Sequence, residues 1–481
     1  MDPILPFDIR LPPEGSRDLL RALHRQLRAA ILDGRLQPGL RLPATRALAD
    51  GLGVSRNTAV AAYDLLLSEG YLAARPGAGT YVADVLRRPK RSEPAAAPGA
   101  DRRLNVLWRT PPAVSPPTSP PTYRFDLRVG LPDTSGFPFH VWRRLSARAL
   151  RKVSRAPAAY ADPQGRRTLR AAIAQHVSFA RAVACQPDDI VVTSGAQQAF
   201  DLLARILVTP GRTAVAIEEP GYPPMRAAFA AAGARIAAVA VDGEGLMVDS
   251  LPTDVRVICV TPSHQYPSGV AMSPRRRAAL LDAAQARGAV VIEDDYDSEF
   301  RFAGRPLDAL QTLDRTGCVF YVGTFSKSLF PALRLGFVAA PSWARSALVT
   351  AKQIADWHAP VLAQDTLAAF ITEGHLARHV RKMRKIYDER RTVLLRALSR
   401  HWGERLEPIP SDAGLHLSAR LVAAIPADPL IAKAAQAGIG LYALGGRTTA
   451  RPRPNGLVFG YGMIVAGRID EAIRQLARLA S

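Results

Sequence analysis

Lys327 is the residue of this sequence best suited to covalent chemistry. Thr324 and Ser326 precede it, and Arg334 follows it on the same stretch. A lysine shielded from water near another cation has a lowered pKa and can attack a carbonyl carbon to form a Schiff base. Two hydroxyl groups and a guanidinium suit a phosphate dianion. The stretch therefore predicts a ligand with both an aldehyde and a phosphate, which is the chemistry of pyridoxal 5′-phosphate.

A strand end should position this lysine. Residues 318–322 are apolar and mostly β-branched or aromatic, which predicts a buried strand directly before the loop of Lys327. Residues 193–198 also follow an apolar run, and they open a helical pattern that would aim backbone N–H groups at an anion, although a glycine turn before a helix often binds nothing. Ligands of open α/β sheets bind at such strand ends. We therefore expect the two segments to serve one site.

Two further strand ends carry aromatic or acidic side chains. Tyr222 follows the apolar run of residues 214–217, where its ring could stack on a planar ligand or merely fill a loop. Glu293, Asp294 and Asp295 follow residues 290–292, and carboxylates this close repel one another. Either water solvates them or a cation compensates them, and a protonated pyridine nitrogen is such a cation. Residues 261–269 add a polar, proline-containing turn.

The pattern from residue 125 onward predicts a layered α/β domain. Short apolar runs alternate with helical stretches, which favours a mostly parallel sheet. Helical patterns dominate after about residue 342, and an α+β segment begins near residue 411. The predicted strands cover residues 190–192, 214–217, 236–239, 255–260, 290–292, 318–322 and 336–339.

The N-terminal pattern predicts three helices and a hairpin. The helices cover about 16–34, 45–53 and 55–69, and the hairpin covers 71–82. We expect Thr45 or a neighbour to cap the second helix and Gly51 and Gly53 to close it.

This outline is that of a helix-turn-helix, although protein-binding modules share it. The third helix opens with Ser55, Arg56, Asn57 and Thr58, and we expect Ser55 to cap it. Polar residues in this turn of a recognition helix meet base edges. The glycines at the hairpin tip would form a wing against the phosphate backbone.

The bulk composition indicates a globular, cytoplasmic protein. The chain has 481 residues, 48% of them hydrophobic, and a formal net charge of +21. Residues 1–83 hold 10 arginines and 8 acidic residues, so the charge alone is weak evidence for nucleic acid. Three scattered cysteines predict no disulfide framework, and the histidines show no metal-ligand spacing. No apolar stretch is long enough to span a membrane.

Residues 84–124 are rich in proline and poor in large aliphatic side chains. Such a composition predicts a semi-rigid linker, and a partner's proline-binding groove is a less favoured alternative. The predicted domains are therefore a reader over residues 10–83, this linker, and a large domain over 125–481.

The N-terminal motifs closely resemble the winged-helix domain of GntR-type bacterial regulators. The resemblance rests on residues 34–46, 52–58, 67–72 and 77–82. It implies duplex DNA as a partner, with Arg46, Arg56 and Thr58 touching the DNA and Gly79 in the wing.

The large domain resembles a fold-type I pyridoxal-phosphate enzyme of the aspartate aminotransferase kind. With the GntR-like head, the whole chain resembles the MocR/GabR family of transcription regulators. The likeness implies Lys327 as the Schiff-base lysine, Asp294 against the pyridine nitrogen, Tyr296 near the ring hydroxyl and Tyr222 on the ring face. It implies a homodimer in which Tyr160 reaches the phosphate of the neighbouring subunit. The phosphate ligands it implies within the subunit are Ala196, Gln197, Thr324, Ser326 and Arg334.

The chain departs from the aminotransferase pattern at two places. Tyr296 lies two residues after Asp294, whereas many aminotransferases space this pair by three. Leu457 lies where those enzymes usually present an arginine for the substrate carboxylate. Arg447, Arg451 or Arg453 could substitute for that arginine.

The favoured hypothesis is a DNA-binding transcription regulator that senses an amine, an amino acid or the cofactor itself through Lys327. A catalytically active aminotransferase with an appended DNA-binding domain is the alternative, and turnover distinguishes the two. A third reading, an inert scaffold without cofactor, is disfavoured by Lys327, Asp294 and Arg334.

Overall fold

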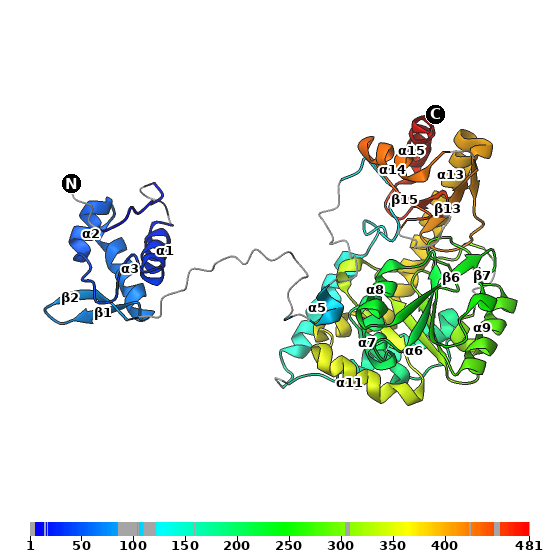
Figure 1. Ribbon diagram of the computed structural model, residues 1–481, viewed down its shortest axis with the longest axis horizontal. Helices are drawn as coiled ribbons and strands as arrows, with labels where there is room; N and C mark the ends of the chain where they lie inside the picture. Colours follow the sequence, from blue (N-terminus) through cyan, green and yellow to red (C-terminus); the bar gives the residue numbers. More distant parts are fainter. Residues whose placement is uncertain are drawn as a thin grey trace. The chain divides into compact units, whose positions relative to one another are not determined.

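The computed structural model describes residues 5–13, 16, 18–84, 103, 105–109, 122–157, 159–303, 308–422, 425–446 and 453–480. The chain divides into two compact units, Met1–Pro98 and Gly99–Ser481 (Figure 1). Among the described residues, no helix is both long and apolar enough to cross a membrane.

The N-terminal unit is a three-helix domain with a hairpin. Leu23 and Leu27 of its first helix pack against Ala59, Ala62 and Leu66 of its third, and all five side chains are buried. This apolar core holds the second and third helices in a helix-turn-helix arrangement. The elements are α1 (Leu19–Leu32), α2 (Thr45–Leu52), α3 (Arg56–Ser68), β1 (Leu72–Arg75) and β2 (Gly79–Val82).

The cap of α3 is confirmed, and two details of α2 are corrected. Ser55 accepts a hydrogen bond from the backbone N–H of Thr58 at 3.1 Å. Thr45 is the first helical residue of α2, and the cap position belongs to Ala44, which offers no side-chain acceptor. Gly51 lies inside α2, and only Gly53 ends it, because its φ of +64° is left-handed.

An eight-stranded sheet forms the centre of the second unit. All seven predicted strands are present, and the sheet is parallel except for β11 and the short β7 at one edge. The order is β4 (Ile190–Thr193), β11 (Gly336–Ala339), β10 (Val319–Thr324), β9 (Val290–Asp295), β8 (Val255–Val260), β5 (Ala214–Glu219), β6 (Arg235–Asp242) and β7 (Gly245–Leu246).

Helices cover both faces of this sheet. Alternate residues of each strand point to opposite sides, so Val191 packs in one apolar cluster while Ile190 and Val192 pack in another. One face carries α7 (Ala196–Leu207), α8 (Pro223–Ala231) and α11 (Arg345–Asp356). The other carries α5 (Phe139–Val153), α6 (Arg167–Arg181), α9 (Pro274–Arg287), α10 (Leu310–Leu313) and α12 (Val361–Thr372). The predicted layered α/β domain is confirmed.

A C-terminal lobe packs beside the sheet domain. Its sheet has the order β12 (Leu406–Pro408), β13 (His416–Leu421), β16 (Gly456–Gly460) and β15 (Tyr442–Ala443). The start of the domain returns here, because β3 (Phe125–Asp126) pairs with β14 (Ile439–Gly440). The lobe also contains α14 (Ala427–Gln436) and α15 (Ala466–Leu479).

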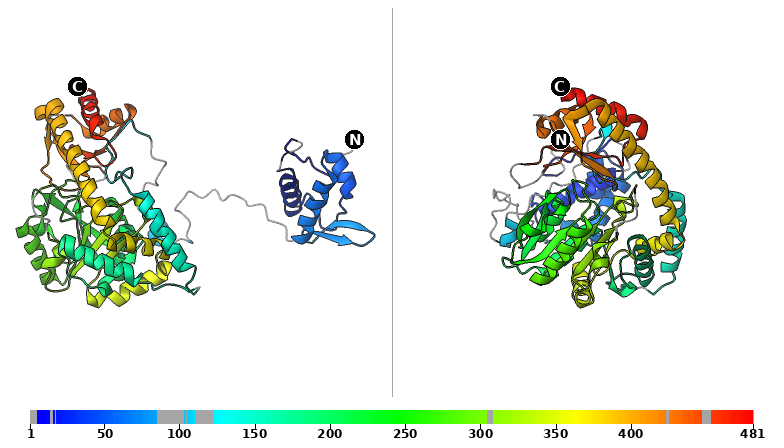
Figure 2. Two further views of the ribbon diagram at one scale, coloured as in Figure 1. Left: turned by 180° about the vertical axis from the view of Figure 1, so that it is seen from behind. Right: turned by 90° about the vertical axis from the view of Figure 1, so that its right-hand side faces the viewer.

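The 28-residue helix α13 (His375–Trp402) connects the two parts of this unit (Figure 2). It packs against α12 of the sheet domain and against α15 and β12 of the lobe. Short 3₁₀ helices cover Pro187–Asp189, Val248–Ser250, Pro331–Leu333, Ser342–Ala344 and Gly403–Arg405.

Most of the predicted linker, residues 84–124, lies outside the described residues. Its described part contains the short helix α4 (Val106–Arg109). Leu107 lies close to Gly233 of the large unit, since a Cβ on that glycine would stand 3.2 Å from the leucine Cδ1. This part of the segment therefore packs against the large unit.

Candidate functional site

The predicted cofactor residues converge on one cavity of about 250 Å³. They reach it from the carboxyl ends of β9 and β10, from the loop after β10 and from the start of α7. The rest of the wall consists of Val129, Gly130, Tyr266, Asp297, Pro331, Leu415 and His416. The predicted residues in the lining are Ala196, Gln197, Tyr222, Asp294, Tyr296, Thr324, Ser326, Lys327 and Arg334.

Lys327 lies in this cavity with its amine shielded from bulk water. Burial lowers the pKa of the ammonium, and the nearby carboxylates of Asp297 and Asp294 oppose this effect without cancelling it. The Nζ donates a hydrogen bond of 2.7 Å to the carbonyl oxygen of Gly130. A lysine with a lowered pKa keeps a larger fraction of neutral amine, which is the nucleophilic form.

An anion cradle lies at the α7 end of the cavity. Gly195 precedes α7 with a φ of +78°, and Arg334 lies against it, because a Cβ on Gly195 would stand 3.0 Å from the guanidinium. Arg334 donates to the carbonyl of Ser194 at 2.8 Å, and the hydroxyls of Thr324 and Ser326 lie 3.0 Å apart. Helix N–H groups, two hydroxyls and a guanidinium together suit a phosphate.

The three consecutive carboxylates of β9 are all buried, so the alternative of a solvated acidic loop is wrong. Asp295 pairs with Arg181 at 2.7 Å, and its pKa is lowered because the cation and two hydroxyl donors outweigh the burial. Glu293 accepts the backbone N–H groups of Leu310 and Gln311 at 2.8 Å and 3.0 Å. Separate partners therefore satisfy these two residues, whereas one ligand cation was considered for the whole group.

Asp294 differs from its neighbours. Its Oδ1 is buried without a hydrogen-bond partner among the described residues. Burial, together with the charges of Asp295 and Asp297, raises the pKa of this carboxyl well above its ordinary range. An unsatisfied buried carboxyl of this kind fits a protonated ring nitrogen, which would supply the missing charge and donor.

Two tyrosines flank the same space. Tyr296 donates its hydroxyl to the carbonyl of His264 at 2.9 Å, and burial raises the pKa of this phenol. The spacing of two between Asp294 and Tyr296 thus still places both in the cavity wall. Tyr222 precedes α8 and makes an edge contact with Tyr266, with the ring centroids 5.4 Å apart.

Tyr160 lies outside this cavity within the chain. Its side chain is 75% exposed, and its ring lies 4.4 Å from that of Trp357. Any role of Tyr160 at a cofactor would therefore need a second subunit.

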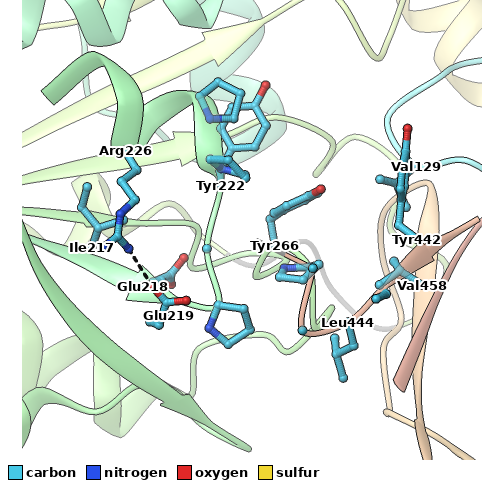
Figure 3. A pocket seen from close by; sticks show the side chains of 18 of the residues that line it. Val129, Ile217, Glu218, Glu219, Tyr222, Arg226, Tyr266, Tyr442, Leu444 and Val458 are labelled. Carbon is cyan, nitrogen blue, oxygen red and sulfur yellow. Dashed lines mark hydrogen bonds and ion pairs between the residues drawn. The ribbon is translucent and has the colours of Figure 1, made fainter. Parts of the chain in front are cut away.

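A second hollow of about 390 Å³ adjoins the Lys327 cavity and shares Val129, Tyr222 and Tyr266 with it. Figure 3 shows Glu218, Glu219 and Arg226 on one wall and Tyr442, Leu444 and Val458 on the other. Glu219 pairs with Arg226 at 2.6 Å. Burial raises the pKa of Glu218 to about 7.

Of the three arginines predicted as alternatives for an effector carboxylate, the structure describes only Arg453. Leu457 is buried in β16. Arg453 is exposed and does not line either hollow. Arg447 and Arg451 lie outside the described residues.

Most of the predicted DNA-reading residues lie in the first turn of α3, and Arg46 lies at the start of α2. Arg46, Arg56 and Asn57 are exposed. The hydroxyl of Ser55 caps α3 by accepting the backbone N–H of Thr58, and it also lies 2.8 Å from the Thr58 hydroxyl. Base contact by Ser55 through that oxygen would therefore compete with the cap.

Sequence reasoning missed Arg41 in this unit. Its Nε lies 3.0 Å from where a Cβ on Gly79 would stand, so the guanidinium rests against the hairpin. Arg41 is exposed and forms no ion pair or side-chain hydrogen bond with any described residue. Arg41 lies in the motif of residues 34–46, but its pairing with Tyr81 forms only when the hairpin folds against that motif.

Gly130, Asp297 and His416 were also missed at the Lys327 cavity. Gly130 and His416 come from segments far from Lys327 in the sequence, so local motifs could not reveal them. Asp297 lies next to Tyr296 and would have been found by extending the acidic motif by one residue.

Comparisons with known proteins agree with this organisation. Residues 19–82 match the family of bacterial regulatory proteins of the gntR type, and residues 125–448 match aminotransferase class I and II. The chain is 37% identical over 462 residues to the probable rhizopine catabolism regulatory protein MocR of Rhizobium meliloti, covering 95% of this chain and 92% of that protein. It is 34% identical over 456 residues to the pyridoxine biosynthesis transcriptional regulator PdxR of Corynebacterium glutamicum, with 94% of each chain covered.

Solved structures match the second unit. A kynurenine aminotransferase of Pyrococcus horikoshii gives a TM-score of 0.69 at 28% identity, over 74% of this chain and 90% of that one. The α-aminoadipate aminotransferase LysN of Thermus thermophilus gives 0.68 at 29% identity, over 74% and 92%.

Proposed function

Because this chain belongs to the MocR/GabR-type transcription regulators, which join a GntR-type winged helix to an aminotransferase-like domain that uses pyridoxal 5′-phosphate, we propose that its cofactor site is a sensor controlling DNA binding. The signal is an amine, an amino acid or the cofactor itself, and the sensing group is Lys327. The reader covers residues 10–83 and the sensor residues 125–481, with residues 84–124 as the linker.

The observation that carries this proposal is the complementarity between the cavity and the cofactor. The unsatisfied carboxyl of Asp294 matches a protonated ring nitrogen, and the cradle at Arg334 matches the phosphate. When bound, the cofactor supplies an aldehyde carbon that forms a Schiff base with a lysine and exchanges it for another amine. Lys327 lines the cavity and would be the lysine in reach, and Tyr222 would lie against the ring.

The hydrogen bond between Lys327 and Gly130 connects the cavity to the C-terminal lobe. In the free state the lysine amine donates to the Gly130 carbonyl, in a segment that continues from β3. That strand pairs with β14 of the C-terminal lobe. If Lys327 held the cofactor, its nitrogen would no longer be a free amine that donates this hydrogen bond. The two states of Lys327 thus differ in a contact to the lobe, and a differential contact is what shifts a two-state equilibrium.

The test is operator affinity measured with and without cofactor, across a panel of amines and amino acids. The proposal predicts that at least one compound changes the affinity by about 5- to 150-fold, the range of ordinary coupling free energies. If neither the cofactor nor any of the amines changes the operator affinity, the proposal is contradicted.

An active aminotransferase is the second candidate, favoured by the nine predicted cofactor residues that line the cavity. Ping-pong turnover of an amino donor and a keto acid at rates of ordinary enzymes, at or above about 1 s⁻¹, would support it. A sensor stops after amine exchange or turns over far more slowly.

We predict that Arg56→Ala weakens DNA binding. If Arg56 reads a base edge, the loss is about 1–3 kcal/mol and depends on the operator sequence. If it holds a phosphate, all sequences weaken alike and the salt slope falls by about one unit. Fluorescence anisotropy over a range of salt concentrations measures both quantities. Arg35→Ala is the matched control, because Arg35 pairs with Asp33 at 2.8 Å. An unchanged affinity and slope in Arg56→Ala would refute this docking.

We further propose a homodimer that acts in the cytoplasm, where its DNA lies. The exposed ring of Tyr160 supports the dimer. The resemblance assigns this tyrosine to the cofactor phosphate of the neighbouring subunit, which it could reach only across a subunit boundary. Sedimentation and cofactor affinity of Tyr160→Phe measure the two parts of this proposal separately.

A further inference from the structure

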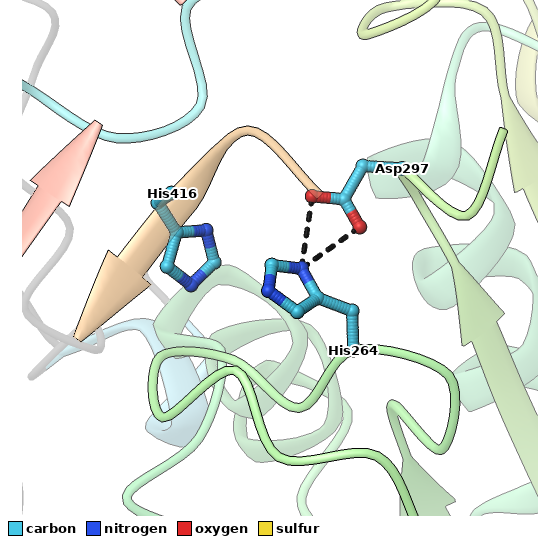
Figure 4. A group of neighbouring side chains, drawn as sticks. All are labelled: His264, Asp297 and His416. Carbon is cyan, nitrogen blue, oxygen red and sulfur yellow. Dashed lines mark hydrogen bonds and ion pairs between the residues drawn. The ribbon is translucent and has the colours of Figure 1, made fainter. Parts of the chain in front are cut away.

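Two histidines and one carboxylate meet beside the Lys327 cavity. His264 lies in the loop after β8, Asp297 follows β9, and His416 opens β13 (Figure 4). Each offers one ligand atom, and these atoms all lie within 4.8 Å of one another. All three side chains are buried, and Asp297 and His416 also line the cavity.

A hydrogen bond at one ring nitrogen of His416 leaves the other nitrogen free to bind a metal. Its Nε2 lies 3.0 Å from the carbonyl oxygen of Pro267, and donation to that oxygen leaves the lone pair on Nδ1. Figure 4 shows the other ring nitrogen turned toward Asp297 and His264. A neutral imidazole with this free lone pair is the form that binds metals.

Asp297 and His264 already have a spacing close to that of two ligands on one ion. The Nδ1 of His264 lies 3.0 Å and 3.1 Å from the two carboxylate oxygens. Ligands at about 2.1 Å from a tetrahedral ion lie about 3.4 Å apart. The backbone N–H of Leu415 donates to Asp297 at 3.1 Å and fixes the carboxylate. His416 has to approach further, because the three ligand atoms lie within 4.8 Å of one another and not within about 3.4 Å.

We propose that His264, Asp297 and His416 bind a divalent first-row transition metal, with Zn²⁺ as the reference ion. Two imidazoles and one carboxylate form a ligand set that such ions accept, and three protein ligands leave a position open. That position faces the Lys327 cavity, because two of the three residues line it. The sequence predicts no metal site because the three ligands come from distant segments and share no spacing motif.

The test uses the full-length protein with its cofactor, freed of metal by a chelator. Titration with Zn²⁺, followed by gel filtration and elemental analysis, should give one bound ion per chain. Asp297→Asn and His416→Gln should each weaken Zn²⁺ binding by more than about 100-fold, a larger loss than that from removing an outer partner of a ligand. Zn²⁺ should also raise the melting temperature of the wild type and not that of the variants.

His401→Gln is the matched control. His401 forms a His–Asp pair with Asp470 at 3.1 Å, far from the cluster in the fold, so this variant should bind Zn²⁺ like the wild type. If a cluster variant fails to fold, Co²⁺ bound to the wild type gives the answer, since a protein site of low coordination number produces intense visible bands and an exposed octahedral site produces weak ones. Absence of stoichiometric binding, weak bands, or equal binding in Asp297→Asn would overturn the proposal and leave the cluster as a hydrogen-bonded support of the cavity.

Discussion

Lys327→Ala should abolish the response of DNA binding to the effector while leaving the DNA binding itself intact. Among the described residues that line the cavity, Lys327 is the only one with an amine, so in the variant neither covalent attachment of the cofactor nor its release by another amine can occur. The reader keeps its own apolar core, in which Leu27, Ala59 and Leu66 are buried. Operator affinity, measured with and without cofactor and amine in the wild type and in Lys327→Ala, decides the matter.

Lys385→Ala is the control for this experiment, since Lys385 is exposed on α13. Borohydride reduction of the wild type, followed by peptide mapping, should place the pyridoxyl label on Lys327. A label on Lys352 would reject the site assignment, and identical effector responses of the wild type and Lys327→Ala would reject the signalling scheme.

The neighbouring residues Asp294 and Asp295 should respond in opposite directions to the same substitution. The pKa of Asp294 is raised in the folded chain, so its carboxylate destabilises the fold as pH rises above the ordinary aspartate pKa of about 3.9. Asp294→Asn removes that charge. We expect the cofactor-free variant to be more stable at neutral pH by about 1–3 kcal/mol and to bind the cofactor more weakly.

Asp295→Asn should instead destabilise the protein by about 3–5 kcal/mol, because it leaves the buried Arg181 without its carboxylate. The pKa of Asp295 is lowered, so its stabilising contribution is present above the ordinary aspartate pKa and is lost as pH falls through the lowered value. Thermal unfolding of both variants between pH 4 and 8, with and without cofactor, tests the contrast. Equal shifts of melting temperature in the two variants would contradict it.

The sheet could be predicted from the sequence because each strand is a short apolar run with its own local signal. The runs 290–292 and 318–322 became β9 and β10, and the lysine loop followed as expected. The cap at Ser55 was equally local. The antiparallel insertion of β11 between β10 and β4 was not predicted, since pairing direction depends on contacts with both neighbours.

At the candidate site, too, some residues could be predicted from local motifs and others could not. Nine residues assigned from motifs and resemblance lie in the cavity wall, and their roles toward the cofactor stay predictions. The partners that decide protonation could not be predicted. Arg181 reaches Asp295 from α6, and Gly130 reaches Lys327 from the start of the domain. Such contacts form only when distant segments pack together, so no periodicity or spacing in the sequence records them.

The helix α13 spans both parts of the large unit and contacts α12 in one part and α15 in the other. Its 28 residues at about 1.5 Å each give a length of about 42 Å. A tilt of about 5° at the α12 end would therefore displace the α15 end by about 4 Å, by simple trigonometry on that length. A change of tilt at one end of α13 would thus move the other end by more than the width of an atom.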